Sequence, residues 1–173
     1  YKDDRVIVNP LRMKKWIVDE LEASMVLFYT GAPRSSDKII REQQENTRKG
    51  KKVQLEATHS IKQSSFIMKE LLLKGDITGF SRTLGKEWEN KKKMAASITN
   101  RHLENIYEAA MNTGAYGGKV SGAGGGGFMF FVTDPVRKLN LIKALGKFNG
   151  RVLNFHFSES GCQGWKITET WKR

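Results

Sequence analysis

The segment from Gly117 to Gly127 has the residue types in this sequence that are most suited to chemistry. Seven of its eleven residues are glycine, and it also carries Lys119 and Ser121. Each glycine costs about 0.5–1 kcal/mol relative to alanine, so such a dense run needs a physical reason. Either the backbone adopts a conformation closed to other residues, or a ligand lies close to the main chain. Because successive amides in such a loop can point inward, the segment predicts an anion-binding loop, with a flexible connector as the alternative.

Two familiar phosphate motifs do not account for this segment. A P-loop needs Gly-Lys followed by Ser or Thr, but Gly118-Lys119 is followed by valine. Three of the glycines, Gly122, Gly124 and Gly127, satisfy the spacing G-x-G-x-x-G. A dinucleotide-binding fold places that spacing between a strand and a following helix, whereas the pattern here predicts helix, loop and then strand. The segment therefore belongs to neither class.

The chain has a large basic surplus, with 30 Lys and Arg against 18 Asp and Glu and a net charge of +12. Nucleic acid, a membrane surface, a phosphorylated metabolite or an acidic partner domain would each fit such a surplus. Acidic residues interrupt most basic stretches, and the only tight run is 91–93. No aromatic residues alternate with the basic ones, so we expect no nucleic-acid partner. Solvated helix faces are the plainer interpretation of most of these charges.

Cysteine and histidine usage indicates a cytoplasmic chain without a metal site. Cys162 has no partner within the chain, which excludes an intrachain disulfide and fits a reducing cytoplasm. His59, His102 and His156 lie far apart and match no metal spacing, and His102 is expected to pack on a helix face. No apolar run is long enough for a membrane span and no signal peptide opens the chain, so we expect no membrane partner.

The hydrophobic pattern predicts strands and helices in an α+β order. Expected strands are 6–8, 24–30, 128–132, 151–157 and a last one around Trp165, Ile167 and Trp171. Expected helices are 13–21, a long polar region that begins at Ser36 or Asp37, is interrupted near Gly50 and stops at Gly75, and then 77–89, 100–112 and 135–148. The fold class predicted over residues 1–173 is α+β, one domain with an antiparallel sheet and helices packed on one face.

The segment Lys119–Gly127, read as Lys-Val-Ser-Gly-Ala-Gly-Gly-Gly-Gly, closely resembles the third conserved motif of the GHMP kinases, the family of galactokinase, homoserine kinase and mevalonate kinase. The order helix, glycine loop, strand is also similar to that family's C-terminal domain, which is ferredoxin-like. Three further segments, 30–36, 88–92 and 114–119, resemble the subgroup that phosphorylates D-glycero-D-manno-heptose 7-phosphate. This looser likeness extends over nearly the whole chain.

The resemblance implies an ATP-dependent, Mg²⁺-dependent sugar kinase acting on the anomeric hydroxyl of heptose 7-phosphate, whose product feeds the activated heptoses of surface polysaccharide. The implied wall of the substrate cleft is Lys119, Ser121, Gly122, Ala123, Gly124, Gly125, Gly126 and Gly127. Candidate contacts for the substrate's phosphate are Arg34, Ser35, Ser36, Lys91 and Lys92. The alternatives are another GHMP kinase, similar to galactokinase or mevalonate kinase, and a basic nucleic-acid-binding module.

One departure from the family pattern is informative. A complete GHMP kinase has an N-terminal domain whose serine-rich motif wraps the nucleotide phosphates, and nothing in this sequence resembles it. The resemblance places the catalytic carboxylate and the magnesium ligands in that half as well. We therefore expect a fragment that begins at Tyr1, lacks its catalytic residues, and needs the N-terminal half as its partner.

Overall fold

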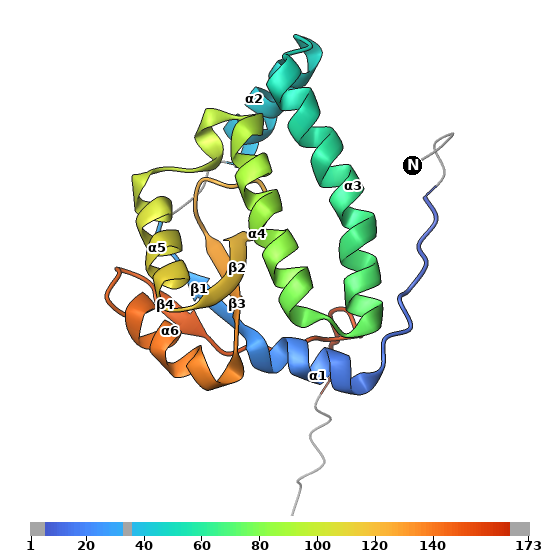
Figure 1. Cartoon of the computed structure of the whole chain (residues 1–173), viewed down its shortest axis with the longest axis vertical. Coiled ribbons are helices and arrows are strands. Elements are labelled where there is room, and N and C mark those ends of the chain that lie inside the picture. Colours follow the sequence, from blue (N-terminus) through green and yellow to red (C-terminus); the bar gives the residue numbers. More distant parts are fainter. Residues whose placement is uncertain (1–5, 33–35, 167–173) are drawn as a thin grey trace, which may run out of the picture.

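The computed structural model describes residues 6–32 and 36–166 (Figure 1). Its strands are β1 (Met25–Tyr29), β2 (Ala115–Val120), β3 (Phe128–Thr133) and β4 (Arg151–Leu153). Its α-helices are α1 (Lys15–Ser24), α2 (Ser36–Arg48), α3 (Lys52–Lys74), α4 (Ile77–Met94), α5 (Arg101–Asn112) and α6 (Lys138–Leu145), with short 3₁₀ helices η1 (Ala96–Ile98) and η2 (Pro135–Arg137).

The four strands form one antiparallel sheet in the order β2-β3-β1-β4. In chain order the domain runs strand, helices, strand, strand, helix, strand. This is the split β-α-β arrangement of ferredoxin-like folds. The predicted α+β class with an antiparallel sheet is therefore confirmed.

One face of the sheet carries the main core. Val26 and Phe28 of β1 and Met129 and Phe131 of β3 are almost fully buried on this face. Helices α4, α5 and α6 cover it with a set of buried side chains: Trp88, Leu103, Ile106, Ala110, Leu141 and Leu145. Helices on one face are what the alternating burial of the strands demands, because the sheet must hide its apolar side.

The opposite face is covered at one end only. Ile17 and Leu21 of α1 pack on Val132 near the start of β1. Four residues earlier along β3 this helix no longer covers the strand, and Phe128 has 39% of its surface exposed. Helix α1 therefore closes one end of this face and leaves open the end that leads into the glycine segment.

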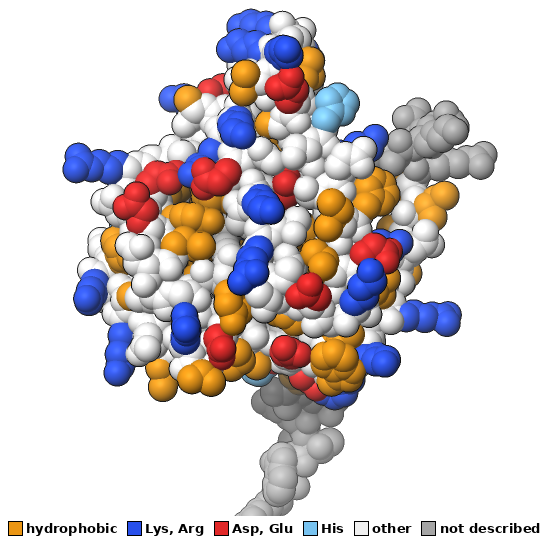
Figure 2. Space-filling view, in the orientation of Figure 1, with side chains coloured by type: hydrophobic (Ala, Val, Ile, Leu, Met, Phe, Trp, Pro, Cys, Tyr) orange, Lys and Arg blue, Asp and Glu red, His pale blue; other side chains and the backbone are white. Residues whose placement is uncertain are grey.

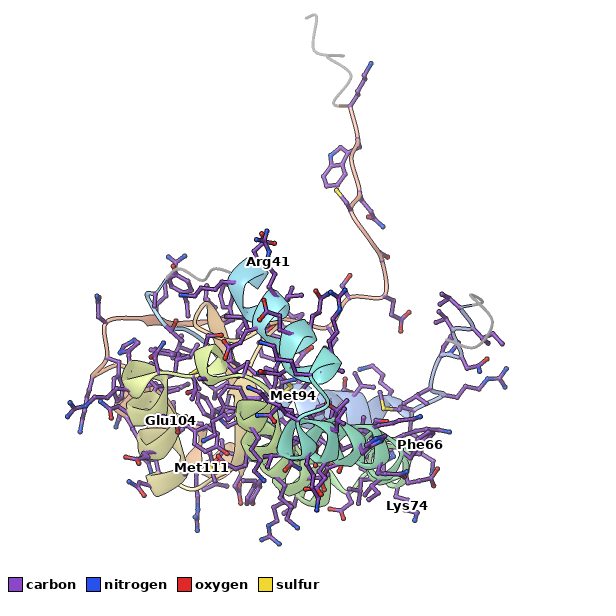
Figure 3. The ribbon with its side chains drawn as sticks, turned by 90° about the horizontal axis from the view of Figure 1, so that it is seen from above. Arg41, Phe66, Lys74, Met94, Glu104 and Met111 are labelled. Atoms are coloured by element: carbon purple, nitrogen blue, oxygen red, sulfur yellow. The ribbon has the colours of Figure 1, made fainter. Side chains whose placement is uncertain are left out.

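Helices α3 and α4 form a long antiparallel hairpin beside the sheet (Figure 1). Helix α4 approaches the edge strand β2 so closely that a Cβ on Gly117 would lie 2.0 Å from the backbone oxygen of Ser81. Of the 23 residues of α3, Ala57 alone is buried. Its outward side chains include Phe66 and Ile67, with 59% and 54% of their surfaces exposed (Figure 3).

Several element boundaries differ from the predicted ones. Residues 6–8 form no strand, and their side chains are exposed. The strand predicted over 151–157 ends at Leu153, opposite Leu27, because its partner β1 begins at Met25 and offers nothing to pair with the last predicted residues; Glu22 accepts the backbone N–H of Phe157 instead. Helix α4 continues to Met94 instead of ending at residue 89. Trp165 has no regular structure, and Ile167 and Trp171 lie outside the described residues.

Candidate functional site

The glycine segment divides into a strand and a loop. Residues up to Val120 belong to β2, so the predicted loop of eleven residues is shorter: it spans 121–127 and joins β2 to β3. Five of its glycines have positive φ: Gly122 (77°), Gly124 (118°), Gly125 (76°), Gly126 (151°) and Gly127 (82°). Side chains with a Cβ rarely adopt this region, so backbone geometry alone accounts for the density of glycine.

The loop is also packed tightly against two neighbouring elements. A Cβ on Gly124 would lie 2.7 Å from the backbone oxygen of Ile98 at the end of η1. A Cβ on Gly125 would lie 2.6 Å from Cδ1 of Ile39, a buried residue of α2. Glycine is therefore needed at these two positions for space as well as for φ, which argues against a flexible connector.

Backbone hydrogen bonds fix the loop from both sides. The N–H of Gly125 donates to the oxygen of Ile98 at 2.8 Å. The N–H of Gly127 donates to Ala32 at 3.1 Å, and its own oxygen accepts the N–H of Thr30 at 2.8 Å. Two of the amides available for an anion nest are thus already used within the domain, so the loop is shaped before any ligand arrives.

Glu42 on α2 supports the loop indirectly, through the short helix η1. Its carboxylate accepts the backbone N–H groups of Ala96 (2.8 Å) and Ser97 (3.3 Å) and the hydroxyl of Ser97, and so caps η1. The hydrogen bond from Ser97 is the main reason that the pKa of Glu42 is lowered, and the backbone N–H groups add to it. Since η1 ends at Ile98, this cap positions the residue against which Gly124 and Gly125 pack.

Of the predicted phosphate contacts, Lys91 is the one that reaches the loop. It lies on α4, and its Nζ donates to the backbone oxygen of Gly122. The contact spans 31 residues of sequence and brings a positive charge to the rim of the loop.

Lys92, the next residue, lies in a different environment. Its Nζ pairs with Glu89 at 2.8 Å and Glu104 at 3.0 Å, and 17% of its side chain is exposed. Burial alone would lower the pKa of Lys92, but the hydrogen bonds to these two carboxylates outweigh it and the pKa is raised. The ammonium also lies over the rings of Trp88 and Tyr107, at 5.9 and 5.8 Å. Its charge is therefore balanced within the domain.

The remaining candidates surround the start of α2. Ser36 is the first residue of that helix and is half-buried, whereas Arg34 and Ser35 lie outside the described residues. In the segment that precedes α2, the backbone oxygen of Thr30 contacts Nε2 of His102 at 2.9 Å. This contact holds the His102 ring against the chain that leads from β1 to α2.

Lys119 is separate from the loop, one residue before the end of β2 and opposite Phe130. Burial lowers the pKa of the Lys119 ammonium. Within 6–32 and 36–166, no carboxylate forms a salt bridge with it. Lys119 therefore presents a half-buried charge on the partly open face of the sheet.

Sequence reasoning missed the residues that support the loop. Glu42, Ile39 and Ile98 gave no chemical signal, and Asn100, whose side chain donates to the oxygen of Gly125 at 3.3 Å, was expected only as the start of the helix over 100–112. These contacts join residues far apart in the sequence. The pair Ile39-Ile40 in the otherwise polar α2 was the available hint, since Lys38 and Arg41 flank it and Ile39 is the buried member.

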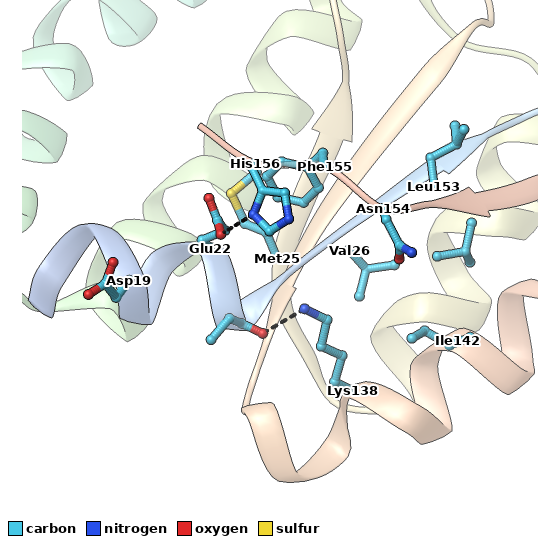
Figure 4. A pocket seen from close by; sticks show the side chains of 12 residues that line it. Asp19, Glu22, Met25, Val26, Lys138, Ile142, Leu153, Asn154, Phe155 and His156 are labelled. Atoms are coloured by element: carbon cyan, nitrogen blue, oxygen red, sulfur yellow. Dashed lines mark hydrogen bonds and ion pairs between the residues drawn. The ribbon is translucent and has the colours of Figure 1, made fainter. Parts of the chain in front are cut away.

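A cavity of about 370 Å³ lies at the other end of β1, between α1, α6 and the segment after β4 (Figure 4). Met25 and Phe155 form part of its apolar wall. Glu22 accepts a hydrogen bond from His156 Nδ1 at 2.7 Å, and Lys138 donates to the oxygen of Ala23 at 2.8 Å. None of the predicted site residues lines this cavity.

Residues 6–32 and 36–166 contain neither a metal-binding cluster nor a membrane-spanning helix. No group of three or more His, Cys, Asp and Glu side chains there is placed to hold a metal ion. No helix in the same ranges is long and apolar enough to cross a membrane.

Comparison with known proteins agrees with the fold and the loop. Residues 68–151 match the family model for the C-terminal domain of the GHMP kinases. The match includes α4, α5, the glycine loop and β3, and the loop has the sequence and surroundings described above. The chain therefore contains a GHMP kinase C-terminal domain, matched over residues 68–151.

Its relatives include heptose-phosphate kinases. The chain is 47% identical over 167 residues to D-glycero-alpha-D-manno-heptose 7-phosphate kinase of Campylobacter jejuni, covering 96% of this chain and 49% of that protein. A solved D-glycero-D-manno-heptose 1-phosphate kinase from Bacteroides thetaiotaomicron is 42% identical with a TM-score of 0.65, covering 95% of this chain and 42% of that one. A mevalonate kinase from L. major, bound to R-mevalonate, shares the fold at 23% identity and a TM-score of 0.59, over 71% of this chain and 37% of that one. The chain thus spans about half the length of its heptose-kinase relatives.

Proposed function

We propose that this chain is the C-terminal half of an ATP-dependent kinase that phosphorylates the anomeric hydroxyl of a heptose 7-phosphate. The observation that carries the proposal is the 47% identity over 96% of the chain to a heptose 7-phosphate kinase. The glycine loop supports it. Phosphoryl transfer depends on positioning and charge stabilisation, and a rigid loop that holds the Lys91 ammonium suits such a reaction. The basic surplus of the chain is consistent with a doubly anionic sugar phosphate as acceptor.

In this reaction the γ-phosphoryl group of ATP moves to the hydroxyl oxygen of the sugar. The bond between the γ-phosphorus and the bridging oxygen breaks, ADP leaves, and the hydroxyl proton passes to a base that we assign to the N-terminal half. The loop at 121–127 would form one wall of the cleft and hold the acceptor in line. ATP and Mg²⁺ would be bound mainly by the N-terminal half, as the resemblance to the family implies.

Among the candidate phosphate contacts of this chain, we assign phosphate binding first to Lys91, because its contact with the loop is seen in the structure. Its hydrogen bond to Gly122 holds the ammonium at the loop, where it would attract an anionic group. Arg34, Ser35 and Ser36 are further candidates next to the loop's partner segment at 30–32. Lys92 is a weaker one, because Glu89 and Glu104 already neutralise its charge.

The test is an ADP-release assay with Mg-ATP and either heptose 7-phosphate or heptose 1-phosphate, since the names of the two relatives differ in the position of the acceptor's phosphate. We expect the complete enzyme to turn over heptose 7-phosphate to a 1,7-bisphosphate, and this 173-residue chain alone to give no turnover. Sustained activity of the chain by itself would contradict the assignment of catalytic groups to the other half.

Lys91→Met in the complete enzyme should raise KM for the phosphorylated sugar about ten- to a hundredfold, the value of one charge-assisted bond, and change the KM for unphosphorylated heptose little. Lys93→Met is the matched control, because Lys93 lies two residues away and is exposed. Equal losses on both acceptors would assign Lys91 to the loop's structure instead.

No observation favours a nucleic-acid-binding module. In Figure 2, Lys and Arg side chains are interspersed with Asp, Glu and apolar side chains on the face shown, without a continuous basic stripe. Activity of the complete enzyme on mevalonate or galactose, with none on heptose phosphates, would instead support the alternative of another GHMP kinase.

A further inference from the structure

Residues Val6, Ile7 and Val8 are anomalous for a folded domain. They are three consecutive β-branched apolar residues, and 64%, 80% and 79% of their surfaces are exposed. The chain is not in regular structure from residue 6 to Lys14, and these residues pair with no strand of the described sheet. Other exposed apolar side chains, such as Trp165 and Phe157, occur singly or in pairs, whereas residues 6–8 are three in a row.

The composition of the segment indicates a strand with both faces covered. In an extended chain Val6 and Val8 point to one side and Ile7 to the other, so neither side is polar. Runs of this kind are typical of inner strands, whereas strands that face water on one side alternate apolar with polar residues. The sequence therefore predicts a strand, but no strand of the described sheet pairs with this segment and its side chains are left exposed.

The position of the segment indicates which part of the enzyme could supply a strand to pair with it. Figures 1 and 3 place it on the side of the molecule formed by α3, away from the four-stranded sheet. Helix α3 also exposes apolar side chains, among them Phe66, which Figure 3 shows on the same side. The heptose-kinase relatives contain a further half that this chain lacks, because the chain covers 49% of one and 42% of the other.

We propose that Val6–Val8 is a strand of a sheet in the N-terminal half of the enzyme, so that the first segment of this chain completes the fold of the other half. The proposal rests on the proposed function only in taking this chain as one half of a longer kinase. Main-chain hydrogen bonds from a neighbouring strand would satisfy the segment's N–H and C=O groups, and the N-terminal half would cover both rows of side chains. The two halves would then be joined by shared secondary structure as well as by the cleft.

Amide hydrogen exchange tests this directly. In this chain alone, the amides of Val6, Ile7 and Val8 should exchange at the rate of an unprotected chain. In the complete enzyme they should slow by at least ~100-fold, as expected for strands in a core. The exposed segment around Gly161 and Gly164, where a Cβ added at either glycine would meet nothing within 4 Å, is the internal control and should exchange fast in both proteins.

Fast exchange of these three amides in the complete enzyme would overturn the proposal. Protection in this chain alone that rises with its concentration would also overturn it, since a second copy would then be the partner. The result is separate from the proposed activity: a protected but catalytically inert protein would refute the kinase assignment and leave the shared strand in place.

A pair of substitutions gives a second test. Ile7→Lys in the complete enzyme would place a charge in the covered core and should lower its Tm by several degrees, or prevent the halves from associating. Val136→Lys is the control, because Val136 is another exposed β-branched residue, with 87% of its surface free. In this chain alone, both variants should have the same Tm as the unmodified protein. A lower Tm for Ile7→Lys in this chain alone would contradict the proposal.

Discussion

The two ends of strand β1 are held in different ways. Beyond Tyr29, the chain is fixed by backbone hydrogen bonds between residues 30–32 and Gly127, and by the packing of Ile39 and Ile98 on glycines. Beside Met25, the strand faces a cavity, and the neighbouring segment is attached by side chains, chiefly Glu22 to His156 and to the N–H of Phe157. His156 has 85% of its side chain exposed.

This contrast has an energetic consequence. Buried backbone contacts without room for a Cβ tolerate almost no change, whereas exposed side-chain contacts are screened by water and contribute little. A pre-shaped loop suits a site that must position a phosphoryl acceptor, because catalysis by positioning is lost with small displacements. The end with the loop should therefore respond strongly to substitution, and the end with the cavity weakly.

The largest effect is expected from Gly125→Val. Valine cannot adopt φ of +76° without strain, and its Cβ would lie 2.6 Å from Cδ1 of Ile39. We expect kcat/KM of the complete enzyme to fall more than ~100-fold, and Tm of this chain to fall by several degrees. The measurements are steady-state kinetics and thermal unfolding followed by circular dichroism.

Gly161→Val provides the control for this substitution, because a Cβ at Gly161 meets nothing within 4 Å. It should leave both kcat/KM and Tm unchanged. If Gly125→Val were as harmless as Gly161→Val, the loop would be a flexible connector, and the difference between the two ends of β1 would disappear.

An intermediate effect is expected from Glu42→Gln. The carboxylate caps η1 through Ala96 and Ser97, and replacing it with a neutral amide weakens charge-assisted bonds in a half-exposed position. After allowance for solvent screening, the loss of stability should be about 1 kcal/mol. Glu45→Gln is the matched control on the same helix, because its exposed pair with Lys49, at 3.6 Å, should contribute almost nothing.

The dependence on pH checks the origin of that effect. The pKa of Glu42 is lowered from 4.5 in the folded chain, so its contribution to stability is complete above the unfolded value and is lost as pH falls through the folded one. The difference in Tm between the unmodified chain and Glu42→Gln should therefore be constant near neutral pH and shrink below pH 4.5. A difference that persisted undiminished in strong acid would show that charge is not the cause.

The sequence predicted the strands and the loop better than it predicted what holds them. Continuous apolar runs at 25–29 and 128–132 are local signals, and so is the dense glycine that requires positive φ. The cap from Glu42 to Ser97 spans 55 residues, and no local pattern reports such a contact. The strand predicted over 151–157 was too long for a related reason, since its partner β1 begins only at Met25 and nothing near residue 151 reports where that distant strand starts. At 6–8 the strand pattern conflicts with the isolated domain, and we attribute this to the absent half.

The smallest effect is expected from Glu22→Gln at the other end of β1. The pKa of Glu22 is lowered chiefly by the hydrogen bond from the N–H of Phe157 and then by His156, although the group is open to water. Because exposed pairs contribute little, Tm should not change measurably. The local consequence is larger than the global one: the amide of Phe157 should exchange faster in the variant, and in the unmodified chain its protection should be lost as pH falls through the lowered pKa, below 4.5. The amide of Gly127, bonded to Ala32, should keep its protection in both proteins. If Glu22→Gln lowered Tm as much as Glu42→Gln, side-chain attachment at the cavity would be as important to the fold as the cap that supports the loop.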